Sequence, residues 1–257
     1  MFGNLCNPTY NQGVMELKEH ATACRIIGIL GGMGPEATLD LYRCIINLTP
    51  AGKDQDHIQV IIYSNPKIPD RTKAIAGGGE SPLPYLIESA QLLEKGGAGI
   101  IAMPCNAAHH YLPEIRRMTR IPFLDMIKET SRSLRSCLHN VKTVGLLASI
   151  GTNRSGIYPR SLAAAGIEVL IPEDDDQQRV ENAINQVKAG KHDRMTKETF
   201  QSVGLRLVQE GAEAVILGCT EIPLAFDPDA VSYMVLNPTR ILAEAAVDWA
   251  LGKRSSV

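Results

Sequence analysis

The chain contains six cysteines, and two of them follow short apolar runs of the kind that form buried strands. Cys105 comes after residues 99–103, and Cys219 comes after residues 214–217. A thiolate is a base and a thiol is an acid. Two cysteines on opposite sides of a planar carbanion can therefore remove a proton from one face of a carbon and return it to the other. We interpret Cys105 and Cys219 as two such opposed acid/base groups.

A thiol pair works at neutral pH only if one sulfur is a thiolate, whereas an unperturbed thiol has a pKa of about 8.5. A helix that begins directly after either cysteine would place its positive end at the sulfur and lower its pKa. Acid/base groups placed in this way contribute about 10² to 10⁴ in rate per proton transfer. Fixed hydrogen-bond donors would stabilise the carbanion further, and Asn106, Thr152 and Thr220 are candidates.

Three other features could contribute to a site. Arg71 ends the loop 65–71, which contains two prolines. Its guanidinium could bind a carboxylate through two parallel hydrogen bonds. The glycines of residues 28–34 do not have the G-x-G-x-x-G spacing of dinucleotide binding, so we expect a tight turn whose amides could face a carboxylate. His109 and His110 would allow a Cys-His nucleophile, but four residues after a strand end need not bring a cysteine and a histidine together.

The elements that would position these side chains alternate along the chain. Stretches such as 86–95 and 199–210 have helical spacing and end at glycines. Alternating strands and helices predict an α/β protein with parallel sheets, whose ligand sites lie at the carboxyl ends of the strands. The predicted strands are residues 26–30, 59–63, 99–103, 143–148, 168–171 and 214–217.

The two halves of the chain resemble each other. Residues 27–30 and 101–106 have counterparts at 144–147 and 215–220, and Gly28 precedes Cys105 by 77 positions where Gly145 precedes Cys219 by 74. This spacing indicates a duplicated unit with one cysteine in each copy. We therefore expect two similar parallel-sheet α/β domains with the site in the cleft between them. The expected boundaries are an N-terminal extension 1–24, a first domain 25–121 completed by 233–252, a second domain 122–232 and a tail 253–257.

Composition excludes several classes of protein. The net charge is −2 with both signs well mixed, so nucleic acid and membrane surfaces are not expected partners. No apolar run approaches the roughly 18 to 20 residues of a membrane span, and charged residues interrupt the first 24 positions where a secretory signal would need apolar ones. The cysteines show no C-x-x-C pair or zinc-ligand spacing, which predicts reduced thiols in a cytoplasmic protein without a metal site.

Five separated motifs are similar to those of the aspartate/glutamate racemase family, and most to its aspartate racemases. They are residues 26–35 around Gly31-Gly32, the loop 65–72, residues 103–106, residues 151–158 and residues 218–221. The resemblance implies two similar α/β domains, one catalytic cysteine from each, no pyridoxal phosphate or metal, and a homodimer. It further implies that Arg71 and Lys188 hold the side-chain carboxylate of the substrate, while Asn106, Thr152 and Thr220 line the α-carboxylate site. The full set of expected substrate-binding residues is Met33, Arg71, Asn106, Ala107, Thr152, Lys188, Thr220 and Glu221.

Two positions bear on the substrate. Glutamate racemases that resemble this chain usually have histidine after the second Cys-Thr, where this chain has Glu221, so L- and D-aspartate are the favoured substrates. Ala107 stands where the family usually has threonine, which removes one hydroxyl donor. The alternatives are a racemase of glutamate or of broader specificity, a related maleate isomerase or hydantoin racemase, and a non-catalytic dicarboxylate-binding module. The charged loop 65–71 argues against a hydantoin site, and the presence of both cysteines argues against a binding module.

Overall fold

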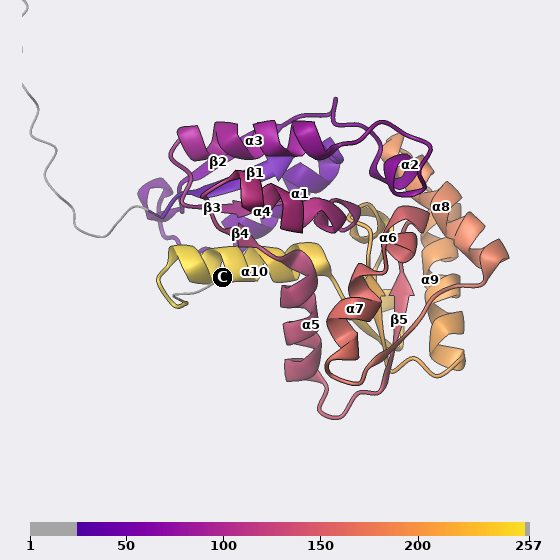
Figure 1. Ribbon diagram of the computed structural model, residues 1–257. Helices are drawn as coiled ribbons and strands as arrows, with labels where there is room; N and C mark the ends of the chain where they lie inside the picture. Colours follow the sequence, from indigo (N-terminus) through magenta and orange to yellow (C-terminus); the bar gives the residue numbers. More distant parts are fainter. Residues whose placement is uncertain (1–24, 255–257) are drawn as a thin grey trace, which may run out of the picture.

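The computed structural model describes residues 25–254, so the predicted N-terminal extension and residues 255–257 of the predicted tail lie outside the described part of the chain. The described residues form two lobes, each built around one sheet with helices on both faces (Figure 1). This arrangement confirms the predicted fold of two parallel-sheet α/β domains.

The first lobe contains a four-stranded parallel sheet in the order β2-β1-β3-β4. Its elements are β1 (Ile27–Gly31), α1 (Pro35–Leu48), the 3₁₀ helix η1 (Asp54–Asp56), β2 (Val60–Ser64), α2 (Arg71–Ile75), α3 (Leu83–Lys95), β3 (Ile100–Ala102), the 3₁₀ helix η2 (Ala107–Tyr111), α4 (Leu112–Met118) and β4 (Phe123–Leu124).

The second lobe repeats this order with a four-stranded parallel sheet β6-β5-β7-β8, as the predicted duplication requires. Its elements are α5 (Met126–Cys137), β5 (Thr143–Leu147), α6 (Ile150–Ser155), α7 (Ile157–Ala163), β6 (Glu168–Leu170), α8 (Asp174–Lys188), α9 (Arg194–Gln209), β7 (Ala214–Leu217), the 3₁₀ helices η3 (Ile222–Ala225) and η4 (Pro228–Ala230), and β8 (Met234–Leu236).

The central strands are apolar throughout because helices cover both of their faces. In β1, Ile27 and Ile29 belong to a core shared with α1, whereas Leu30 points to the opposite core with α3 and α4. The strand β7 is likewise buried along its whole length. Parallel strands enclosed in this way end at a common edge, and the two edges carry the residues of interest.

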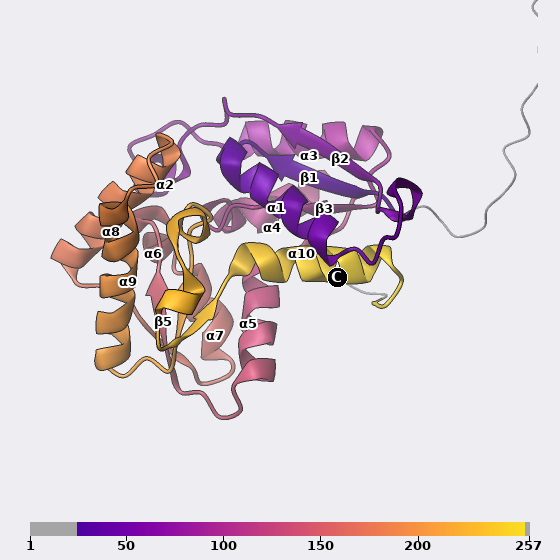
Figure 2. The ribbon, with the colours of Figure 1, turned by 180° about the vertical axis from the view of Figure 1, so that it is seen from behind.

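The last helix, α10 (Pro238–Ala250), returns to the first lobe. Figure 2 shows it lying along α1 and against the upper end of α5, so that it connects the two lobes. Among residues 25–254, no helix combines the length and the apolar character that crossing a bilayer requires.

Strand pairing moves two of the expected domain boundaries. Phe123 pairs with Ile101 in the first sheet, so that sheet extends past the boundary expected between residues 121 and 122. Met234 pairs with Ala214, so β8 belongs to the second sheet although residues 233–252 were expected in the first domain. In each sheet a short fourth strand pairs with the free edge of the third strand. A strand of two or three residues is too short to show a hydrophobic period in the sequence.

Candidate active site

One pocket lies between the lobes, where the carboxyl ends of β1, β3, β5 and β7 face each other. The pocket is small, and its empty space of about 350 Å³ includes a part that is open to solvent. The structure brings all ten residues predicted from sequence into this pocket. Its lining is Met33, Asp70, Arg71, Thr72, Cys105, Asn106, Ala107, Ser149, Thr152, Lys188, Cys219, Thr220 and Glu221.

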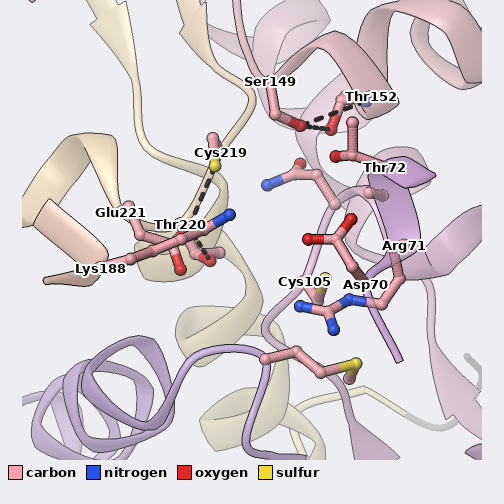
Figure 3. Close-up of a pocket in the computed structure, with 13 residues that line it drawn as sticks. Asp70, Arg71, Thr72, Cys105, Ser149, Thr152, Lys188, Cys219, Thr220 and Glu221 are labelled. Atoms are coloured by element: carbon pink, nitrogen blue, oxygen red, sulfur yellow. Dashed lines mark hydrogen bonds between the residues drawn. The ribbon is translucent and has the colours of Figure 1, made fainter. Parts of the chain in front are cut away.

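The two cysteines occupy equivalent positions in the two lobes. Cys105 lies between β3 and η2, and Cys219 lies between β7 and η3. Their exposed fractions are 6% and 8%, so both sulfurs are removed from bulk water but lie at the pocket wall. Figure 3 shows them on opposite sides of the pocket, Cys219 with Lys188 and Glu221, and Cys105 with Asp70 and Arg71.

The surroundings of Cys219 differ from the expectation that a helix end lowers its pKa. The helix that follows, η3, is a 3₁₀ helix of 4 residues. Burial of the sulfur and the charge of Glu221 raise the pKa of the Cys219 thiol well above its ordinary value, and Lys188 opposes them only in part. The thiol donates a hydrogen bond to Oε2 of Glu221 at 3.0 Å. Cys219 is therefore protonated in this arrangement.

Lys188 stands at the last turn of α8 and points into the pocket (Figure 3). Burial disfavours its charged form, but Cys219 when it is a thiolate and the carboxylates of Glu221, Asp70 and Glu181 outweigh burial and raise the pKa of the amine. Lys188 is thus a cation at neutral pH, positioned to attract an anionic substrate group.

The loop that carries Arg71 is held close to the turn after β1. Gly32 has a φ of +94°, and a Cβ there would overlap the backbone of Asn65, so only glycine allows this approach. One terminal nitrogen of Arg71 donates to the carbonyls of Ile68 and Pro69 at 3.1 and 3.0 Å. The Nε of Arg71 is buried without a hydrogen-bond partner. The two backbone carbonyls thus fix the guanidinium, and its Nε remains available to donate a hydrogen bond to a ligand.

Asn106 is held in a similar way. The hydroxyl of Tyr158, on α7 of the second lobe, donates to Oδ1 of Asn106 at 2.7 Å. This bond orients the amide across the boundary between the lobes. The Nδ2 of Asn106 is buried without a partner. Because buried donors in native proteins are almost always paired, two unpaired donors in one pocket indicate a site for an anionic oxygen ligand.

Thr152 occupies the start of α6, where Ser149 caps the helix by accepting from the Thr152 backbone at 3.3 Å. The two hydroxyls lie 3.1 Å apart. Helix α8 also holds the N-terminal end of α6, because the carboxylate of Glu181 on α8 accepts a hydrogen bond from the Ile150 amide at 2.8 Å. The hydroxyl of Thr152 is therefore placed at the pocket by contacts within the second lobe.

The glycine-rich turn after β1 contributes less than the sequence suggested. The amide of Gly32 donates to Oγ1 of Thr38 at 2.8 Å, so it is not free for a ligand. Met33 from the same turn does line the pocket.

His109 is a buried structural residue, not the partner of the Cys105 sulfur. Its Nδ1 lies 2.8 Å from the Cys105 carbonyl oxygen, and the Met126 amide donates to its Nε2 at 3.1 Å. An imidazole that accepts at Nε2 must donate from Nδ1, so the ring is neutral. It ties the loop of Cys105 to the start of α5. Burial is the main cause that lowers the pKa of His109.

Neutral His109 predicts a pH-dependent stability. Above about pH 6.5 the ring is neutral in both folded and unfolded chains, but below it the unfolded chain binds the proton first. The free energy of unfolding should therefore fall as pH drops below about 6.5, by at most about 1.4 kcal/mol per pH unit from this group. In urea titrations at several pH values, the free energy of unfolding of His109→Gln should fall less steeply with decreasing pH than that of the wild type. His57→Gln, at an exposed position, serves as the control, and equal slopes in all three proteins would contradict the assignment.

The two lobes touch where α2 meets α6. A Cβ on Gly151 would lie 2.5 Å from Oγ1 and 2.8 Å from Cα of Thr72, closer than side chains tolerate. The absence of a side chain at Gly151 therefore allows α2, with Arg71, to close over the pocket.

Gly151→Ala is expected to raise the KM for substrate roughly tenfold or more, because overpacking of this kind costs about 1–3 kcal/mol and here it keeps α2 from closing. Steady-state kinetics would measure the change. Gly78→Ala, where a Cβ would meet nothing within 4 Å, is the matched control. An unchanged KM in Gly151→Ala would show that closure does not depend on this contact.

Sequence reasoning missed four residues of this region: Asp70, Thr72, Ser149 and Tyr158. Asp70 and Thr72 flank Arg71 in the motif 65–72, and Tyr158 ends the motif 151–158, so both motifs held the signal. Ser149 was detectable as a helix cap. Within residues 25–254, no group of three or more His, Cys, Asp or Glu side chains is arranged to hold a metal ion.

Comparison with known proteins supplies independent evidence. The family described as Asp/Glu/hydantoin racemase matches residues 30–246. The chain is 30% identical over 234 residues to the broad specificity amino-acid racemase RacX of Bacillus subtilis, covering 90% of this chain and 100% of that one. Its structure is similar to that of Picrophilus torridus aspartate racemase, with a TM-score of 0.79, 34% identity and coverage of 88% and 94% of the two chains. An aspartate racemase homologue from Pyrococcus horikoshii gives a TM-score of 0.72 at 28% identity, covering 88% and 99%.

Proposed function

Because the chain belongs to the Asp/Glu/hydantoin racemase family, we propose that it interconverts L- and D-aspartate by proton transfer between Cys105, the α-carbon and Cys219, without pyridoxal phosphate or a metal ion. The observation that carries this proposal is one pocket with a thiol on each side and two buried, unpaired donors, on Arg71 and Asn106, between the lobes. The thiols supply the two bases, and the donors match substrate carboxylates.

In the proposed reaction, the thiolate of one cysteine takes the α-proton from one face of aspartate. The electron pair of the broken C–H bond remains on the α-carbon and delocalises into the α-carboxylate. The thiol of the other cysteine then donates its proton to the opposite face, which gives the enantiomer and leaves that sulfur as the thiolate. Asn106, Thr152 and Thr220 would donate to the α-carboxylate as its charge grows.

The charges of the pocket support a dicarboxylate substrate. Arg71 and Lys188 enter from opposite lobes (Figure 3), so together they can hold a side-chain carboxylate while the lobes are closed. Asp70 and Glu221 are the carboxylates in the lining and could face the substrate ammonium group.

A second candidate is a racemase of broader specificity, including glutamate. It is favoured by the full-length similarity to RacX and by Ala107, whose methyl group lines the pocket where the family resemblance implies a threonine hydroxyl. Loss of one hydrogen bond to a carboxylate weakens binding by about 1–3 kcal/mol, which would reduce discrimination between substrates. A homodimer and a cytoplasmic location, which would keep the thiols reduced, are further predictions.

Incubation of the protein with L-aspartate and with D-aspartate in deuterated water tests the proposal. We expect loss of the α-proton signal by NMR and formation of the opposite enantiomer by chiral chromatography, from either starting enantiomer. Parallel incubations with glutamate and alanine distinguish the two candidates. Exchange of all three at similar rates would favour broad specificity, and inert aspartate beside an active second amino acid would overturn the substrate assignment while keeping the chemistry.

A further inference from the structure

We propose that Glu221 is a positioning residue that acts through Cys219, holding the proton on that sulfur so that the free enzyme begins each cycle with Cys219 as the acid and Cys105 as the base. This inference rests on the proposed function and deepens it. It changes the expected role of Glu221, which the sequence predicted only as a substrate-binding residue.

The geometry around Glu221 supports this role. Its Oε2 lies 3.0 Å from the Cys219 sulfur and also accepts from the Thr220 hydroxyl at 3.4 Å. The residue is 4% exposed, so water does not compete for the carboxylate. A Cβ at Gly34 would lie 3.3 Å from Oε1, which shows that the other oxygen faces the glycine-rich turn. The ionised form of Glu221 can only accept hydrogen bonds, so with Glu221 ionised this contact keeps the proton on the sulfur.

The charges that surround this contact come from both lobes. Lys188 on α8 is the cation of the second lobe that faces the sulfur and the carboxylate, with Glu181 of the same helix behind it. Asp70 adds negative charge from the first lobe, while Arg71 lies beside Cys105 (Figure 3). A thiolate at Cys219 would therefore be repelled by the carboxylates of Glu221 and Asp70, and Lys188 would offset this repulsion only in part. Asp70 lies on the same side of the pocket as Cys105 (Figure 3), but within the described part of the chain the sulfur that hydrogen-bonds a carboxylate is that of Cys219.

This asymmetry has a kinetic consequence. In one direction Cys105 takes the α-proton and Cys219 gives up its own, which leaves a thiolate against Glu221. In the other direction the enzyme must start from that less stable form. Since the equilibrium constant between enantiomers is one, kcat/KM must be equal for both, so the asymmetry can appear only as kcat and KM values that differ in the same proportion. The enantiomer that starts from the stable form is the one with the lower KM.

Alkylation of the free enzyme with iodoacetamide over a range of pH, with each cysteine quantified by peptide mass spectrometry, tests the proposal without any substrate. In the wild type, Cys219 should react with a higher pH midpoint than Cys105. In Glu221→Gln, which keeps an acceptor oxygen but removes the charge, the midpoint of Cys219 should fall by about one pH unit or more. Glu210→Gln is the matched control, because it removes an exposed carboxylate at the end of α9 that does not line the pocket.

The difference in KM between the enantiomers should also shrink in Glu221→Gln and persist in Glu210→Gln. An unchanged Cys219 midpoint in Glu221→Gln would overturn the proposal, as would a wild type in which Cys219 reacts at the lower pH. The comparison of the Cys219 and Cys105 midpoints in the wild type tests the proposal even if Glu221→Gln does not fold. If the midpoint shifts but aspartate is not racemised, the role of Glu221 stands and the proposed substrate falls.

Discussion

Replacing Cys105 or Cys219 with alanine is expected to lower the rate of aspartate racemisation by about 10² to 10⁴-fold in each single variant, because each removes one acid/base group from the reaction. The effect should be similar for both, since the sulfurs lie on opposite sides of the pocket (Figure 3) and each serves one face of the α-carbon in the proposed mechanism. Both side chains are small, so alanine leaves little empty space, although Cys219→Ala also removes the thiol hydrogen bond to Glu221.

The single variants should differ in what they retain. Each keeps one sulfur facing one side of the α-carbon, so exchange of the α-proton with deuterated water should survive for at most one enantiomer, and for opposite enantiomers in the two variants. NMR in deuterated water measures exchange, and chiral chromatography measures racemisation. Cys44→Ala, outside the pocket, is the control. Racemisation within tenfold of wild type in either pocket variant would contradict the two-base mechanism.

Replacing Arg71 with alanine is expected to lower kcat/KM for aspartate by about 100- to 1,000-fold, since losing a charge-assisted contact in a buried site costs about 3–4 kcal/mol. The guanidinium is already fixed by the Ile68 and Pro69 carbonyls, and its Nε is buried and unpaired. Its ordering therefore costs little when a carboxylate binds. The loss should fall mainly on KM if Arg71 only binds the carboxylate.

The same variant separates the candidate substrates. If Arg71 holds a side-chain carboxylate, turnover of alanine, which has none, should change far less than turnover of aspartate. Lys73→Ala removes an exposed cation from the same helix, α2, and should leave both rates near wild type. An equal fall for aspartate and alanine in Arg71→Ala would place the guanidinium at the α-carboxylate, and intact aspartate turnover would remove it from the site.

The sequence determined the parts of this protein that depend on local pattern. Apolar runs of strand length, glycine stops and the repeated spacing to Cys105 and Cys219 predicted two parallel α/β lobes with one thiol at a strand end of each. Parallel strands end at one edge, so the pattern also predicted that both cysteines would lie at the cleft. The extents of the short strands β4 and β8 were not predicted, because their pairing with β3 and β7 defines them and their own composition does not.

Only the tertiary structure decided the state and the orientation of the site groups. A buried thiol responds to charges through space, and Glu221 and Lys188 reach Cys219 from different elements, so its pKa is raised where the local helix argument predicted a fall. Tyr158 orients Asn106 from a position 52 residues away. His109, four residues from Cys105, binds the backbone instead of the sulfur. Burial, desolvation and hydrogen-bond geometry belong to the packed chain, and no spacing along the sequence specifies them.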